Sequence, residues 1–317
     1  MYFPYLYGRA YDLLALRSIL KDHRALGGLI PIVEPVNSNS SAIERCLADY
    51  SEADQRICVL VNPDKHELKN PIAAKAWQKN FVDFIDDKNS VIPLLRCDAA
   101  ITQASIDSFL KKFSDREVAF LYQGCGLDDA GVKKLAAIKT VVFHIGVDAK
   151  ISASHRALLP KDKYVDIKDC FTKLVRNADY NGAEFYTDRH KTFAASGCGF
   201  GDYATIGSVF QAGGSTPYAV AIHAAYKDPK TGDIWVEHFV SDDKEKDDSD
   251  VATKFLQAAK KLTAAATKRK KEFGQNYSID AYVAYVAGSY FPGLPKNKQH
   301  QIEHHLCLML DVLSGDV

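Results

Sequence analysis

Short apolar runs recur along the first part of the chain at nearly regular intervals. Each run is rich in β-branched residues, and most end in a polar or charged residue. The runs are YFPYLYG (2–8), LIPIVEPV (29–36), RICVLVNP (56–63), VIPLLRCD (91–98), EVAFLYQG (117–124), KTVVFHIG (139–146) and YVDIKDCF (164–171). Strands that are apolar throughout are typical of parallel sheets that are buried on both faces.

Helix-like segments with periodic apolar residues separate most of these runs. A strand and a helix repeated in this way predict parallel strands joined by crossover helices. We place an eighth, weaker strand in GFGDYATIG (199–207). Eight such units favour a closed barrel over an open sheet, so we predict an α/β fold with a (β/α)8 TIM-like barrel over residues 1–210.

The pattern changes after residue 210. Two alternating segments, 215–226 and 234–242, flank a Gly-containing turn and predict a β-hairpin. Three further segments predict helices at 251–273, 278–291 and 297–313. We therefore expect residues 211–317 to form a C-terminal β-hairpin with a helical extension that caps the barrel.

Composition limits the compartment and the partners that we expect for the protein. The 317 residues include 40 Lys and Arg and 40 Asp and Glu, so the formal net charge is zero and nucleic acid is not indicated as a partner. No apolar run approaches the roughly 20 residues of a membrane span, and the first residues do not read as a signal peptide. The seven cysteines form no CxxC pair, which favours reduced thiols. Together these features predict a cytoplasmic protein without a membrane partner.

Ligands of (β/α)8 barrels bind at the carboxyl ends of the strands, where the loops converge. The polar residues at the predicted strand ends are therefore candidates for ligand binding. They are Glu34, Asn62, Arg96, Asp98, Gln123, His144, Lys168 and Asp169. The alternative is that such residues cap helices or satisfy backbone groups. Lys168 could form a Schiff base if it points inward, but strand alternation leaves open which face is inside.

The stretch 176–207 is the densest in polar and aromatic residues, and it lies where barrel proteins often bind phosphate. Its glycines would let backbone N–H groups approach an anion, and an arginine could add a bidentate contact. The ligand-binding candidates here are Arg176, Tyr180, Gly199, Gly201 and Tyr203. The acid–base candidates are Asp169, Asp188, His190 and Asp202. The alternative is a long surface loop folded over the barrel mouth.

The segment HQIEHH (300–305) contains the pattern H-x-x-E-H. On a helix, His300 and His304 would lie on one face and could bind Zn²⁺, with Glu303 as a base or orienting group. The sequence identifies no third ligand, and the favoured alternative is a polar helix face that packs its histidines against the barrel. The cofactor stays unknown, and the chain has no P-loop, nucleophile elbow or dinucleotide fingerprint that would identify one.

Five stretches of the chain resemble one known family. They are MYFPYLYGRAYDLLALR (1–17), LIPIVEPV (29–36), IKDCFTKLVRNADY (167–180), GFGDYATIG (199–207) and FPGLPKNKQHQIEHH (291–305). Together they resemble the beta-protein family of bacterial and phage proteins over the whole chain. The resemblance implies a barrel-like fold and a setting among mobile elements and phage-defence genes, often beside a second small gene. It transfers no catalytic residues.

Three hypotheses follow. In the first, a phage-defence barrel protein binds or processes a small anionic ligand, nucleotide-like or phosphate-like, at the carboxyl rim of the barrel. In the second, a non-enzymatic scaffold binds a protein partner encoded nearby through the hairpin and the terminal helices. In the third, a zinc-dependent hydrolase uses His300, Glu303 and His304. Whether the protein is an enzyme stays open.

Overall fold

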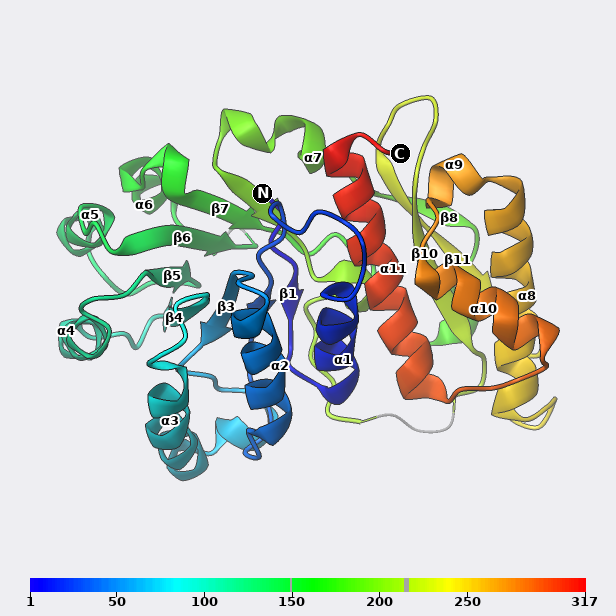
Figure 1. Cartoon of the computed structure of the whole chain (residues 1–317), viewed down its shortest axis with the longest axis horizontal. Coiled ribbons are helices and arrows are strands. Elements are labelled where there is room, and N and C mark those ends of the chain that lie inside the picture. Colours follow the sequence, from blue (N-terminus) through cyan, green and yellow to red (C-terminus); the bar gives the residue numbers. More distant parts are fainter. Residues whose placement is uncertain (149, 214–216) are drawn as a thin grey trace. The chain divides into compact units, whose positions relative to one another are not determined.

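A computed structural model describes residues 1–148, 150–213 and 217–317, and these form two compact units (Figure 1). The barrel unit contains Met1–Leu20, Leu26–Asp169 and Lys191–Tyr203. The C-terminal unit contains Lys21–Ala25, Cys170–His190 and Ala204–Val317. This division differs from the expected boundary at residue 210, because residues 170–190 belong to the C-terminal unit.

Eight parallel strands form the sheet of the barrel unit, in the order β1-β2-β3-β4-β5-β6-β7-β9. The strands are β1 (Tyr5–Leu6), β2 (Ile32–Val33), β3 (Ile57–Leu60), β4 (Val91–Cys97), β5 (Val118–Tyr122), β6 (Val141–Val147), β7 (Tyr164–Ile167) and β9 (Gly199–Gly201). The first segment of the chain also bonds to β9, because the Phe3 N–H donates to the Phe200 carbonyl oxygen at 2.9 Å. The sheet is therefore a nearly closed barrel, and the predicted TIM-like fold is confirmed.

Two glycines allow this closure. A Cβ atom on Gly199 would overlap the Phe3 ring, and one on Gly201 would overlap the Phe3 carbonyl oxygen. Only a residue without a side chain lets β9 approach the first strand this closely. The glycines that suggested an anion-binding loop therefore have a structural role in joining the last strand to the first.

Helices follow most strands and lie outside them, as α3 to α6 do in Figure 1. They are α1 (Ala10–Ile19), α2 (Ser41–Glu52), α3 (Pro71–Ile85), α4 (Gln103–Lys112), α5 (Asp129–Ala136) and α6 (Ala153–Leu158), with α7 (Arg189–Thr192) at the boundary between the units. In α3, the Asn70 side chain caps the first turn, and Trp77, Phe81 and Ile85 recur every fourth residue to form the buried stripe.

The C-terminal unit is built on an antiparallel sheet in the order β10-β11-β8. The strands are β10 (Ala221–Lys227), β11 (Ile234–Val240) and β8 (Ala183–Thr187). The hairpin of β10 and β11 is the predicted one, although residues 215 and 216 of its expected first strand lie outside the described residues. Strand β8 was not predicted. It is the third strand of this sheet and pairs with β11, which lies about 50 residues later in the sequence.

Four helices pack in the C-terminal unit: α8 (Val251–Lys268), α9 (Lys270–Phe273), α10 (Tyr277–Ala287) and α11 (Leu294–Ser314). Their apolar side chains, among them Phe255, Phe273 and Tyr282, form one core with the hairpin. The predicted packing of these helices on the barrel stays a prediction. Among the helices of the described residues, none combines the length and the apolar character needed to cross a membrane.

Candidate functional site

A buried ion pair lies in the mouth of the barrel, at the carboxyl ends of its strands. Glu34 follows β2 and Arg96 lies near the end of β4, with β3 between them, so the two side chains meet across the inside of the barrel. The Arg96 Nη2 group donates to Glu34 Oε1, and the Tyr5 hydroxyl donates to Glu34 Oε2 at 2.6 Å. Glu34 is 0% exposed and Arg96 is 2% exposed.

The loop after β3 supplies two further charges. The Arg96 Nη1 group forms an ion pair with Asp64, whose side chain is 59% exposed. The Lys65 ammonium lies 3.5 Å from Glu34 Oε1 and 3.6 Å from Asp64 Oδ1. Partial burial opposes ionisation of Asp64, but the Arg96 guanidinium outweighs it and lowers the pKa of that carboxyl. The mouth is therefore a small network of alternating charges with one solvent-facing member.

The backbone of Arg96 is held in place by Asn62. The Asn62 side chain donates to the Arg96 carbonyl oxygen at 3.0 Å and accepts from the Arg96 N–H at 2.8 Å. These two hydrogen bonds hold the backbone of β4 at the residue that carries the guanidinium. The Nε atom of Arg96 is buried without a hydrogen-bond partner in the described part of the chain. A buried donor without an acceptor lowers the stability of the folded protein. An acceptor atom of a ligand at this position would form the missing hydrogen bond.

Three tyrosines line another side of the mouth. The Tyr5 ring lies 5.0 Å from Tyr203 and 5.8 Å from Tyr7, measured between ring centroids. Burial, together with the nearby Glu34 carboxylate, raises the pKa of Tyr5 and Tyr7. All three phenols therefore stay protonated at neutral pH, and they offer apolar faces with hydroxyl donors to a ligand.

Two carboxyl groups lie at the ends of β6 and β7. The Asp169 N–H donates to Asp148 Oδ1 at 2.5 Å. Partial burial raises the pKa of Asp148, and the Asp169 charge raises it further. Both carboxylates act electrostatically on Tyr203, so they belong to the same mouth. The raised pKa favours the protonated form of Asp148 relative to an ordinary aspartate.

The structure brings five of the sequence candidates together here: Glu34, Asn62, Arg96, Asp169 and Tyr203. Asp98 instead accepts a hydrogen bond from the Ala100 N–H on the outer side of the strands. Gln123 follows β5, where its N–H donates to the Cys97 carbonyl oxygen. Lys168 is exposed, so it lacks the burial that would activate a Schiff-base lysine.

His144 does not reach the mouth. It lies in the middle of β6, and its Nδ1 atom is hydrogen-bonded to the Tyr122 hydroxyl at 2.9 Å. Its neighbour in the sheet register, Phe120, packs on Phe109 of α4, which puts this side of the strands against the helices. Burial lowers the pKa of His144 to about 4, so the imidazole is a neutral core group.

The remaining loop candidates are divided between the units. Asp202 belongs to the barrel unit, is buried and accepts a hydrogen bond from the Tyr2 hydroxyl at 2.8 Å. Gly199 and Gly201 close the barrel as described above. The other four belong to the C-terminal unit: Arg176, Tyr180, Asp188 and His190. The proposed acid–base set of Asp169, Asp188, His190 and Asp202 is therefore not one cluster within either unit.

Three of the four candidates of the C-terminal unit have local partners, and the fourth, Asp188, lies at the surface. Arg176 is largely exposed and forms a bidentate pair with Asp179, with N–O distances of 2.6 and 3.1 Å. Tyr180 packs against His223 and His238, with centroids 4.5 and 4.7 Å away. His190 Nε2 lies 3.0 Å from the Gly232 carbonyl oxygen, and Asp188 is exposed.

The H-x-x-E-H segment lies in α11 and its side chains have structural partners. His304 Nε2 bonds to the Ala225 carbonyl oxygen at 2.8 Å, and its Nδ1 bonds to Asn276 at 3.0 Å. Glu303 accepts from Ser278 and lies 2.8 Å from His300 Nδ1. With both nitrogens of His304 engaged, the geometry gives no support to a zinc site. Across residues 1–148, 150–213 and 217–317, no three His, Cys, Asp or Glu side chains are grouped to hold a metal ion.

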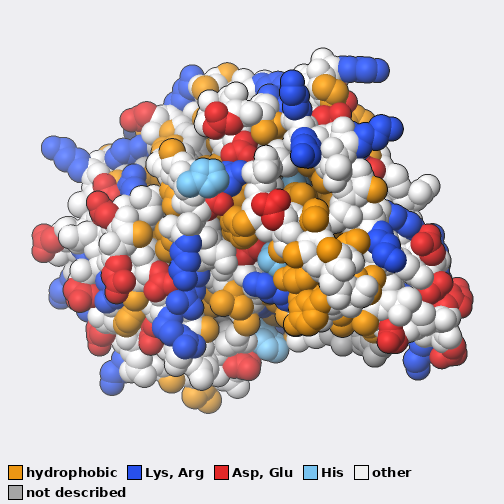
Figure 2. Space-filling model, turned by 45° about the vertical axis from the view of Figure 1, so that its right-hand side comes forward, with side chains coloured by type: hydrophobic (Ala, Val, Ile, Leu, Met, Phe, Trp, Pro, Cys, Tyr) orange, Lys and Arg blue, Asp and Glu red, His pale blue; other side chains and the backbone are white. Residues whose placement is uncertain are grey.

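Five residues of the mouth were not among the predicted site residues: Tyr5, Tyr7, Asp64, Lys65 and Asp148. The alternation of aromatic residues at 3, 5 and 7 is the signal that could have identified the tyrosines, because residues two apart share a face of a strand. Figure 2 shows Lys, Arg, Asp and Glu side chains interspersed on the face it draws.

Comparisons of the chain with protein-family models, with curated proteins and with solved structures found no match.

Proposed function

We propose that the mouth of the barrel binds a small anionic ligand, and that Arg96 and Lys65 recognise its anionic group. The observation that carries this proposal is the buried Glu34–Arg96 pair, whose guanidinium also holds the exposed Asp64 carboxylate. A buried ion pair adds little net stability, because the loss of hydration offsets the attraction between the charges. Its position at the ligand-binding end of a barrel favours a role in binding.

Asp64 is the group that a ligand would replace. Glu34 and Arg96 are buried and Lys65 is partly buried, but the Asp64 carboxylate lies in a loop, faces solvent and contacts Arg96 Nη1. A phosphate or carboxylate of the ligand could take its place on Arg96 and also reach Lys65. The unpartnered Nε atom of Arg96 offers one more donor. Asp148, with its raised pKa, would be the group able to exchange a proton with the bound ligand.

The test is a calorimetric titration with inorganic phosphate as the probe of the anion subsite. Asp64→Asn removes the internal competitor, so phosphate should bind about fivefold more tightly, the equivalent of about 1 kcal/mol. Arg96→Lys keeps a positive charge beside Glu34 but loses the planar guanidinium, which can donate two parallel hydrogen bonds to an anion. Phosphate binding should therefore weaken by about tenfold. Asp49→Asn, which breaks the exposed Arg17–Asp49 pair between α1 and α2, is the matched control. Unchanged affinity in both mouth variants would refute the proposal.

We also propose that this ligand binding serves phage defence, a setting that only the sequence resemblance to the beta-protein family supports. Bacteria that carry the gene, plated with a panel of phages, test it. Protection that is lost with Arg96→Lys and kept with Asp49→Asn would support a defence role that depends on the mouth. Equal plaque counts with and without the gene would argue against the setting and would leave the phosphate titration unaffected.

The second candidate function, a scaffold for a protein partner, is favoured by a separate observation. The C-terminal unit exposes apolar side chains along α10 and the turn after it, with Val283 46% exposed and Tyr290 60% exposed. Exposed apolar side chains that lie close together are typical of interaction surfaces. Sedimentation of the chain with the purified product of the second small gene that the resemblance implies tests this. A complex that Val283→Glu abolishes would support it, and no complex at micromolar concentrations would refute it.

A further inference from the structure

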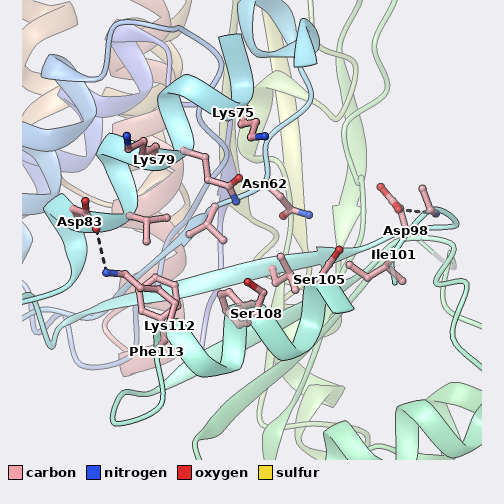
Figure 3. A pocket seen from close by; sticks show the side chains of 16 residues that line it. Asn62, Lys75, Lys79, Asp83, Asp98, Ile101, Ser105, Ser108, Lys112 and Phe113 are labelled. Carbon is pink, nitrogen blue, oxygen red and sulfur yellow. Dashed lines mark hydrogen bonds and ion pairs between the residues drawn. The ribbon is translucent and has the colours of Figure 1, made fainter. Parts of the chain in front are cut away.

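A groove separates α3 and α4 on the outer side of the barrel unit, with a volume of about 800 Å³ (Figure 3). It opens because the side chains that α3 turns toward α4 are mostly polar. The buried stripe of α3 is Trp77, Phe81 and Ile85, whereas the residues it turns toward α4 include Lys75, Gln78 and Lys79. Helices pack closely where apolar ridges fill facing grooves, and here that filling is missing.

The floor of the groove is apolar. It is formed by Val61 and Leu95 at the ends of β3 and β4, and by Val82 and Phe109 from the two helices. One end is closed by Lys112, which bonds to Asp83 and Asp86 across the helices at 3.1 Å each. A floor of this kind, closed at one end, suits the apolar body of a small molecule, and the volume lies in the range of ligand pockets.

The lip of the groove carries positive charge that no carboxylate of the described residues neutralises. Lys75 and Lys79 lie one turn apart on α3, and Figure 3 shows both beside the cavity. Neither has a hydrogen bond or an ion pair within the described residues, whereas Lys112 is already paired. Across the groove, α4 presents the hydroxyls of Ser105 and Ser108. The lip can therefore accept an anionic group from one side and donate to its oxygens from the other.

We propose that this groove is a second binding site, separate from the barrel mouth, for a small amphiphilic anion. The apolar body of the ligand lies on Val82, Leu95 and Phe109, and its anionic group contacts Lys75 and Lys79. Charge complementarity selects this ligand class, because the two uncommitted lysines line a groove that has an apolar floor. A neutral apolar molecule would use the floor alone and bind less tightly.

A pair of probes tests the two parts of the site. Anilinonaphthalene sulfonate has an aromatic body with one sulfonate, and phenylnaphthylamine has the same rings without the charge. Both become fluorescent in an apolar environment, so titration of the full chain gives an affinity for each. Lys75→Gln with Lys79→Gln should weaken the sulfonate by about tenfold, as expected for two partly exposed charge contacts, and should change the neutral probe by less than twofold.

Two further variants complete the design. Ser108→Trp fills the groove from an exposed position on α4, so it should abolish binding of both probes without disturbing the core. Lys133→Gln with Lys134→Gln removes two exposed charges from α5 in the same unit and should change neither affinity. The proposal is overturned if Ser108→Trp leaves both affinities intact, or if the α3 and α5 lysine variants weaken the sulfonate equally.

Discussion

Removal of Arg96 tests whether the buried ion pair stabilises the fold or serves the mouth. Arg96→Met leaves the Glu34 carboxylate buried, with only the Tyr5 hydroxyl and the more distant Lys65 as partners. Leaving one charge of a buried pair uncompensated costs about 3–5 kcal/mol. Lys65, 3.5 Å away and partly exposed, offsets part of this, so we expect a loss near the lower end of that range.

The double variant decides between the two roles. Glu34→Leu with Arg96→Met replaces both members of the buried pair by apolar side chains. Such replacements of buried pairs are neutral or stabilising by about 1–4 kcal/mol. We therefore expect the double variant to unfold at the same or a higher urea concentration than the wild type, although each single variant is less stable. This pattern would mean that the pair is not kept for stability.

The chain provides a clean reporter for this measurement. It has two tryptophans, Trp77 in the barrel unit and Trp235 in the C-terminal unit. In a Trp235→Phe background, the tryptophan fluorescence comes from the barrel unit alone. Unfolding of the C-terminal unit by urea therefore does not contribute to the signal from which the barrel's free energy of unfolding is obtained. Arg17→Met, at an exposed pair between α1 and α2, should cost less than about 1 kcal/mol. A double variant that loses as much as both single variants together would refute the reasoning.

Three other changes follow from single contacts. Gly201→Ala should destabilise the barrel by more than about 2 kcal/mol or prevent its folding, whereas Gly27→Ala, which meets nothing within 4 Å, should stay within about 0.5 kcal/mol in the same urea assay. Because burial lowers the pKa of His144 from 6.5 to about 4, the unfolded chain takes up a proton first as the pH falls. Barrel stability should therefore fall by up to about 3 kcal/mol between pH 6.5 and 4, and His144→Asn should flatten this slope. The Cys97 thiol and a backbone N–H lower the pKa of Cys125 to about 7, so Ellman's reagent should show a fast phase near neutral pH that Cys125→Ser removes.

The barrel could be predicted because its signal is local. Each strand carries its own apolar run, and the spacing of the runs fixes the parallel order. The side-chain directions could not be predicted in the same way, because both faces of a parallel strand are buried. His144 shows the consequence: β6 continues three residues past it, and the residue that reaches the end of the strand is Val147. The candidates between residues 176 and 190 failed to gather for another reason, since β8 pairs with β11 much later in the chain.

Closure of the barrel and formation of the mouth depend on the same few residues. Phe3 packs against Phe143 at 5.0 Å, although β7 and β9 lie between their strands, so alternate residues of the first segment point inside the barrel. Two residues on, Tyr5 binds Glu34 and stacks near Tyr203. Tyr203 lies two residues after Gly201, the last residue of β9, so the glycine contact that brings β9 to the first strand also brings the tyrosine to the mouth. A side chain at Gly201 that strained this contact would move Tyr203 away from Tyr5 and Glu34. Folding and ligand binding should therefore weaken together at this position, whereas a change at Asp64 should alter binding alone.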